Sequence, residues 1–136
     1  MVDLVRFGVS IQKQLLDKFD KYIRKQNYRN RSEAIRDLIR TSLVEEEWSQ
    51  DQDIAGGIVY VYNHHQRQLV NKILQVQHDF HNLIISSQHV HLDHHNCLEI
   101  VSVKGRANHV GNLYHRLKSM KGIKHIDIVK STTGKI

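Results

Sequence analysis

The chain has 136 residues, of which 40% are hydrophobic, and a formal net charge of +6 with histidine counted as neutral. This length is enough for one compact domain or two small ones, and no apolar stretch is long enough to span a bilayer. Cys97 is the single cysteine, so an intrachain disulfide is excluded and the reducing cytoplasm is the expected compartment.

Charge and histidine are unevenly distributed along the chain. Residues 1–43 hold ten Lys or Arg against five Asp or Glu, whereas residues 44–136 hold ten against nine. All eleven histidines follow residue 63. A basic N-terminal segment is typical of a protein that meets nucleic-acid phosphate, although a solvated charged surface has the same composition. The distribution predicts two parts with different functions.

The first part of the chain predicts one strand and two helices. Residues 5–10 alternate apolar and polar side chains, which is the pattern of a half-buried strand. Ser10 is expected to cap a helix over about residues 11–26, and a second helix follows Asn30, whose spacing from Glu33 suits a capping arrangement. These elements are too few to bury a core. A second copy of the chain, with its strand paired to the first in an intertwined dimer, would complete it.

The second part begins after a predicted linker. Residues 49–57 are polar and then glycine-rich. Strands are expected at 58–62, 83–92, 97–104 and 123–130, and helices at 66–82 and 108–120. Their order, β-α-β-β-α-β, is typical of ferredoxin-like folds. The predicted organisation is therefore an N-terminal domain over residues 1–48, a linker, and a C-terminal domain over residues 58–136.

His89, His91 and Cys97 form the clearest chemical pattern. Residues i and i+2 of a strand face the same side about 7 Å apart, so the two imidazoles can converge on one ion. The turn that follows returns Cys97 alongside them, and His78 on the preceding helix can supply a fourth nitrogen. Three imidazoles and a thiolate suit Cu(II), Ni(II) or Zn(II), and the spacing leaves the metal open. The alternative is two exposed strand histidines and a small buried cysteine; the eight other histidines are expected to be mostly surface residues.

The predicted N-terminal strand also suits DNA. If its apolar side chains face the dimer core, Arg6, Gly8 and Ser10 face outward. A two-stranded ribbon fits the major groove, where Arg6 can pair with guanine for roughly 1–3 kcal/mol of discrimination. Arg29 and Arg31, beside the start of the second helix, are placed to hold phosphate. An ordinary edge strand is the alternative.

These residues together resemble the nickel-responsive regulators of the NikR family. Residues 6–11 are similar to the family's DNA-binding ribbon, and residues 30–40 to its second helix. Its metal motifs are matched by Gln77-His78, His89-Val-His91 and Cys97-Leu-Glu99, and Gly122-Ile-Lys-His125 is similar too. The resemblance spans nearly the whole chain. It departs at Gly8, where the family usually has Ser or Thr, and at Gln12, where many members have Pro.

The resemblance implies an α+β protein with a ribbon-helix-helix DNA-binding domain, followed by an ACT-like metal-binding and tetramerisation domain. It implies a homotetramer, built as a dimer of dimers, that represses transcription from a palindromic double-stranded operator when Ni(II) is bound. Square-planar Ni(II) would be held by His89, His91 and Cys97 of one subunit and His78 of another. Glu99 would lie beside these ligands.

The resemblance also implies that Arg6, Gly8 and Ser10 read bases. It further implies that Glu33 and Asp37 hold a second cation, such as K⁺, at the interface between the DNA-binding and metal-binding domains. Read without the resemblance, these two carboxylates are a helix surface that pairs with neighbouring arginines. One alternative is a ribbon-helix-helix regulator that senses another metal or a small molecule. Another is a metal buffer. An enzyme is the least favoured class, because the sequence contains no catalytic triad or phosphate-binding glycine loop.

Overall fold

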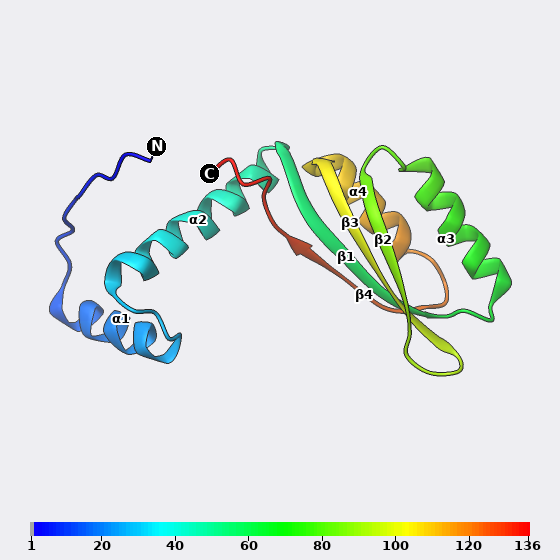
Figure 1. Ribbon diagram of the computed structural model, residues 1–136, viewed down its shortest axis with the longest axis horizontal. Coiled ribbons are helices and arrows are strands. Elements are labelled where there is room, and N and C mark those ends of the chain that lie inside the picture. Colours follow the sequence, from blue (N-terminus) through cyan, green and yellow to red (C-terminus); the bar gives the residue numbers. More distant parts are fainter. Residues whose placement is uncertain (1) are drawn as a thin grey trace. The chain divides into compact units, whose positions relative to one another are not determined.

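The structure, a computed structural model, describes residues 2–136 and divides the chain into two compact units (Figure 1). The first unit ends at Arg40, and the second comprises Thr41–Ile136. The boundary falls inside helix α2 (Arg31–Ser49), so this helix contributes to both units. No helix within residues 2–136 is both long and apolar enough to cross a membrane.

The first unit contains helix α1 (Lys13–Lys25) and the first part of α2, close to the two helices predicted from the sequence. The predicted cap of α2 is confirmed, because Asn30 Oδ1 accepts the backbone N–H of Glu33 at 2.9 Å. Ile23 of α1 and Ala34 of α2 are the buried side chains of these helices. This is a small buried set for a folded unit.

The N-terminal segment differs from its prediction in two respects. Ser10 does not cap α1: the helix begins after Gln12, and no side chain caps it. Residues 5–10 form no strand in the part of the chain described, and Val5 and Phe7 are 84% and 68% exposed. A strand exists only through hydrogen bonds to another strand. The predicted partner here is the same segment of a second copy.

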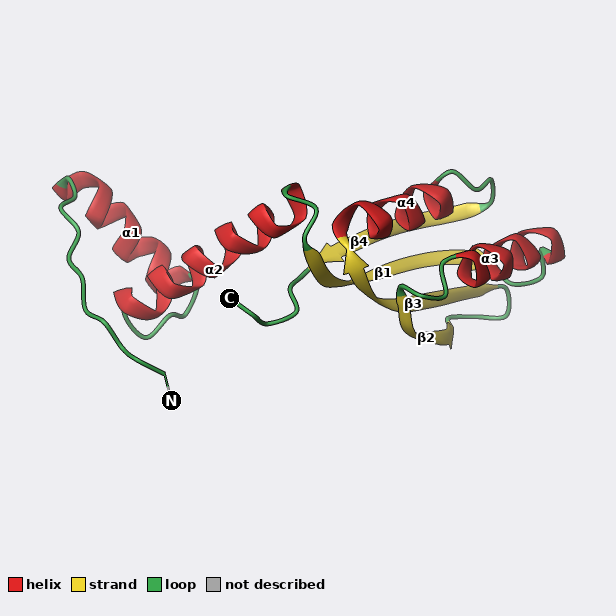
Figure 2. Ribbon diagram, turned by 90° about the horizontal axis from the view of Figure 1, so that it is seen from above, coloured by secondary structure: helices red, strands yellow, loops and turns green. Residues whose placement is uncertain are grey.

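The second unit is a sheet with two helices and confirms the predicted β-α-β-β-α-β order. Its elements are β1 (Asp53–Asn63), α3 (Arg67–Asp79), β2 (Ile84–His91), β3 (Asn96–Arg106), α4 (Ala107–Lys118) and β4 (Ile123–Lys130). The strands lie in the order β2-β3-β1-β4, and every neighbouring pair is antiparallel. Helices α3 and α4 cover the same face of the sheet (Figure 2).

Alternate residues of the two central strands face these helices and form the core. Ile58 and Tyr60 of β1 and Val101 of β3 are fully buried, in one cluster with Ile73 of α3 and Leu113 of α4. Burying each such aliphatic side chain contributes about 1.5–3 kcal/mol. The second unit thus buries an extended core within one chain, and this core is the frame on which the metal-binding candidates lie.

The composition predicts a linker at Gly56 and Gly57, and this prediction is wrong. Both glycines lie within β1, which begins at Asp53. A Cβ on Gly56 would stand 2.6 Å from the Val129 carbonyl oxygen and 3.4 Å from the Trp48 ring. Gly56 is therefore required by the close approach of these groups rather than by flexibility. Composition alone does not distinguish the two uses of glycine.

Candidate metal centre and nucleic-acid interface

The pairing of β2 with β3 brings His91 beside Cys97. The two residues are register partners, and antiparallel partners point to the same face of a sheet. Cys97 Sγ lies 3.4 Å from His91 Nδ1; the cysteine is fully buried and the histidine is exposed. Neighbouring ligands of one ion, bound at about 2.1–2.3 Å, are about 3.1 Å apart in a square-planar site and about 3.6 Å apart in a tetrahedral one. This pair of donor atoms therefore fits a shared metal.

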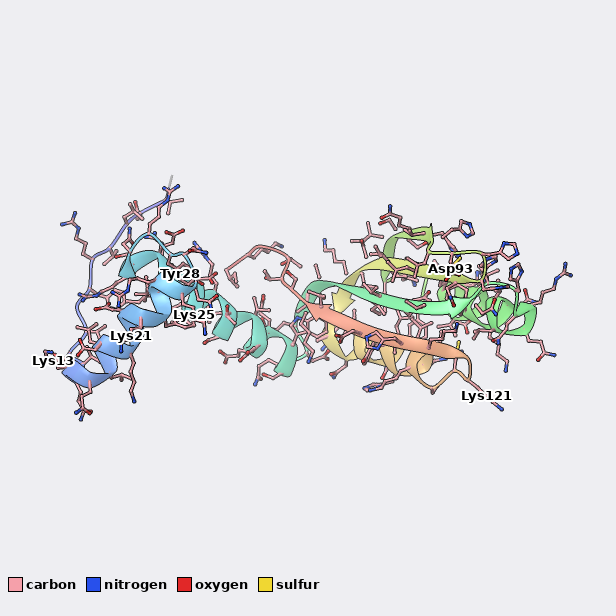
Figure 3. All side chains as sticks on the ribbon, turned by 90° about the horizontal axis from the view of Figure 1, so that it is seen from below. Lys13, Lys21, Lys25, Tyr28, Asp93 and Lys121 are labelled. Atoms are coloured by element: carbon pink, nitrogen blue, oxygen red, sulfur yellow. The ribbon has the colours of Figure 1, made fainter. Side chains whose placement is uncertain are left out.

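The turn between β2 and β3 is held by Asp93 (Figure 3). Its Oδ1 accepts the backbone N–H groups of His95 at 2.8 Å and Asn96 at 2.7 Å, and its Oδ2 accepts the Asn96 side-chain amide at 3.0 Å. The hydrogen bonds from Asn96, and then that from His95, lower the pKa of Asp93 to about 2. The turn that returns Cys97 beside His91 is therefore fixed by a carboxylate that stays charged at neutral pH.

His89 lies on the same face as His91 and is the register partner of Glu99. Its Nδ1 is 3.5 Å from Glu99 Oε1, and its Nε2 is 2.7 Å from the Tyr62 hydroxyl. The ring centroids of His89 and His91 are 6.3 Å apart. A proton on Nδ1 facing the carboxylate leaves Nε2 free to accept from Tyr62 or to bind a metal.

Glu99 is a buried carboxylate with several donors. It is 3% exposed, accepts the Tyr60 hydroxyl at 2.8 Å, and accepts Gln77 Nε2 at 3.1 Å on each oxygen. Burial, and then the charge of Glu99, raises the pKa of Tyr60 well above its usual range. A buried charge needs such partners. They also fix the carboxylate toward which the His89 ring is turned.

The Cys97 thiol suits a metal ligand better than a nucleophile. Burial, followed by the charges of Glu99 and Asp93, raises the pKa of this thiol above its usual value. A nucleophilic cysteine needs a lowered pKa, whereas a metal ion displaces the thiol proton directly when it binds. The donors present, two imidazole nitrogens and the thiolate sulfur that remains once the proton is displaced, fit the ligands that copper, nickel and zinc accept.

His64 is a candidate that the sequence did not single out. The ligand atoms of His64, His91 and Cys97 all lie within 4.8 Å of one another, the only such group of His, Cys, Asp and Glu found within residues 2–136. His64 follows β1, and its backbone N–H donates to the His95 carbonyl at 3.0 Å. The register of β1 against β3 is the signal that could have found it. His78 on the last turn of α3 is exposed and, like His89, lies outside this group.

The side chains predicted to meet DNA belong to the first unit. All five predicted residues are exposed: Arg6, Gly8, Ser10, Arg29 and Arg31. The guanidinium of Arg31 lies 2.9 and 3.0 Å from the two carboxylate oxygens of Asp20, so an ion pair already engages it. Lys13, Lys21 and Lys25 extend the basic surface along α1 (Figure 3).

Glu33 and Asp37, the predicted second cation site, line a pocket of about 440 Å³ in the first unit. The Arg29 backbone N–H donates to Glu33 at 3.2 Å, and the Tyr28 hydroxyl donates to Asp37. This hydrogen bond to Asp37 raises the pKa of Tyr28 to about 12. Three arginines also line this pocket: Arg29, Arg36 and Arg40. A bound cation would compete with these positive charges for the two carboxylates.

Two family models match the chain, one for each part. Residues 5–46 match the ribbon-helix-helix protein of the copG family, and residues 55–131 match the NikR C-terminal nickel-binding domain. An uncharacterized protein from Thermotoga maritima has a similar fold, with a TM-score of 0.53 and 13% sequence identity, over 57% of this chain and 96% of that chain. That likeness concerns the fold alone.

Curated relatives match over almost their whole length. A protein of Syntrophus aciditrophicus is 55% identical over 136 residues, covering 100% of this chain and 99% of the relative. One of Pyrococcus furiosus is 53% identical over 133 residues, and one of Chlorobium limicola is 51% identical over 134. These two matches cover 97% and 98% of this chain, and 96% and 100% of the relatives. All three relatives carry the name nickel-responsive regulator.

The fold and the matched models define a transcription regulator with a ribbon-helix-helix DNA-binding part and a nickel-binding part, not an enzyme. The chain belongs to the nickel-responsive regulator family. The predicted family and the α+β fold class, a ribbon-helix-helix segment followed by a ferredoxin-like domain, are both confirmed.

Proposed function

We propose that this chain is a nickel-dependent repressor whose metal centre is made by His89, His91 and Cys97 of one subunit and His78 of another. The observation that carries the proposal is the register of β2 against β3, with Cys97 Sγ 3.4 Å from His91 Nδ1. His89 is turned toward the same side by Glu99, as a metal-binding histidine is turned by a carboxylate. The family match supports nickel among the metals that this donor set accepts.

His78 belongs to the proposal through the resemblance of Gln77-His78 to a metal motif of the nickel-responsive regulators, and its position is compatible with that role. It is exposed at the end of α3 and stands apart from the His64, His91 and Cys97 group of its own chain. An exposed imidazole on a fixed helix end is available to a second subunit. The corresponding assembly is a homotetramer made as a dimer of dimers, in which residues 58–136 supply metal binding and tetramerisation.

A second candidate function is sensing of another divalent metal through His64, His91 and Cys97, which lie together in one chain. Three ligands and an open position suit Zn(II). Chelator-competition titrations of H64A and H78A with Ni(II) and, separately, with Zn(II) distinguish the two candidates. Nickel binding through a second subunit requires H78A to lose affinity and H64A to keep it. The reverse pattern favours the single-chain site.

The DNA-binding half of the proposal rests on the exposed N-terminal segment. Val5, Phe7 and Val9 are 84%, 68% and 64% exposed, although they are the apolar members of the alternating pattern. Pairing with a second copy would bury them and form a ribbon that presents Arg6, Gly8 and Ser10 to the major groove of a palindromic operator. Arg29 and Arg31 would contact phosphate, Arg31 after releasing Asp20.

Nickel would act on DNA binding through a difference in affinity between states of the tetramer. Bound metal would favour the state in which two DNA-binding dimers have the spacing of two half-sites. The second cation, such as K⁺ at Glu33 and Asp37, would strengthen the same state. The proposed cation site is supported by the two carboxylates that line one pocket. The arginines that line the same pocket disfavour a bound cation.

A further inference from the structure

His78 lies between two residues that are tied to different parts of the second unit. Gln77, the residue before it, points inward: its Nε2 donates to the Tyr60 hydroxyl at 2.9 Å and to both Glu99 oxygens at 3.1 Å. These bonds hold the last turn of α3 to the central strands β1 and β3. They fix the backbone on one side of His78.

Asp79, the residue after His78, is held from the neighbouring helix. Arg116 of α4 places Nη1 3.2 Å from Asp79 Oδ2, and Gln75 of α3 donates to Asp79 Oδ1 at 3.0 Å. The Arg116 guanidinium also lies over the Phe80 ring, 5.5 Å from its centroid. One arginine of α4 thus contacts both residues that follow His78. We call this set, Arg116 with Asp79 and Phe80, the arginine clamp.

The end of the helix is closed by further local bonds. The His81 backbone N–H donates to the His78 carbonyl at 3.2 Å, and His81 Nδ1 lies 2.9 Å from the same oxygen. Leu83, a little further on, accepts the Lys104 N–H of β3 at 2.8 Å. The backbone around His78 is therefore held by contacts to the sheet, to α4 and within the turn that follows it, while the His78 imidazole is exposed.

We propose that Arg116 is a positioning residue for the nickel centre, which fixes the end of α3 so that His78 reaches the other subunit without further ordering. The inference rests on the proposed role of His78 as a ligand. An exposed ion pair contributes little to the stability of a fold. Such an ion pair has a larger effect on metal affinity when it orders a metal ligand, because an ordered ligand loses less conformational entropy when the metal binds.

The test is a competition titration of the full-length protein with Ni(II) against a chelator. We expect R116A to bind nickel about threefold to tenfold more weakly than the wild type, with the thiolate-to-nickel absorption retained. The matched control is R67A, which removes an exposed arginine from the other end of α3 and should leave the affinity unchanged. R116K keeps the charge and should recover part of the loss.

Two further measurements separate positioning from a general loss of stability. D79N should weaken nickel binding like R116A, and the double variant should be no weaker than either single one, because both break the same contact. Thermal unfolding of the metal-free variants should match that of the wild type.

The outcomes distinguish this inference from the proposed function on which it rests. If H78A loses nickel affinity while R116A binds as tightly as the wild type or R67A, the positioning role is wrong and the ligand assignment stands. If H78A itself binds nickel normally, the ligand assignment fails and the positioning role fails with it. Additive losses in R116A and D79N would also overturn the clamp.

Discussion

The two units of the chain differ in how far one copy completes them. In the second unit, Ile58, Tyr60 and Leu113 are fully buried, and the sheet closes its core within one chain. In the first unit the apolar residues Val5 and Phe7 remain largely exposed. The contrast indicates that the metal-binding candidates rest on a core that one chain forms by itself, whereas the proposed DNA-binding ribbon would require a second copy.

The largest effect is expected at the metal centre. C97A should lower nickel affinity by at least about 100-fold and abolish nickel-dependent operator binding, because the thiolate is the one anionic group among the four proposed ligands. The second unit should stay folded, since Ala fits the buried position at the cost of a small cavity. Isothermal titration and an operator-binding assay measure both. A C97A protein that still bound its operator only with nickel present would refute the assignment.

The next effect belongs to the first unit alone. R6A should weaken operator binding by about tenfold to 100-fold, the value of a lost bidentate contact to guanine, and leave nickel affinity unchanged. Fluorescence anisotropy with labelled operator, beside a nickel titration, measures the two quantities. The control is R67A. An equal loss of DNA affinity and nickel affinity in R6A would contradict the assignment of DNA binding to the first unit and nickel binding to the second.

Proton release by Cys97 should make nickel binding depend on pH. Burial raises the pKa of this thiol above its usual value, so the thiol is protonated at neutral pH, and each bound nickel must displace a proton. Apparent affinity should therefore rise with pH, by up to about tenfold per unit, until the pH passes the raised pKa. C97H, which has no thiol, should give a flatter profile between about pH 7 and 9. The same slope in both proteins would exclude the thiol as its source.

The smallest expected effect tests the frame of the second unit. G56A should lower its stability by about 1–3 kcal/mol, because the new methyl would meet the Val129 carbonyl oxygen at 2.6 Å. G57A is the matched control: its nearest neighbour, the Val101 carbonyl oxygen, would be 3.9 Å away. Chemical denaturation compares them. Equal stabilities of the two variants would contradict the claim that close contacts require glycine at position 56.

Local patterns predicted most of the elements and part of the site. The last strand was predicted at the residues where β4 lies, and Asn30 caps α2 as its spacing from Glu33 indicates. The H-x-H pair and Cys97 lie on neighbouring strands, as the turn between them requires. These features depend on residues that are near one another in the chain.

Features that depend on distant residues were not predictable in the same way. His64 approaches His91 and Cys97 only through the register of β1 against β3. Gly56 resembles a linker residue until Trp48 and Val129 are seen to crowd it. The Arg116–Asp79 contact joins two helices whose packing no local pattern reveals.

The central claim, a nickel centre shared between subunits, is tested most directly by mixing two inactive variants. C97A supplies an intact His78, and H78A supplies an intact His89, His91 and Cys97. Subunits of the two are exchanged, and the thiolate-to-nickel absorption and operator binding are measured. A shared centre predicts that the mixture regains both signals, which each variant alone lacks, since hybrid tetramers contain complete ligand sets. If the mixture shows no more than the sum of the two separate variants, His78 does not serve a second subunit and the account is wrong.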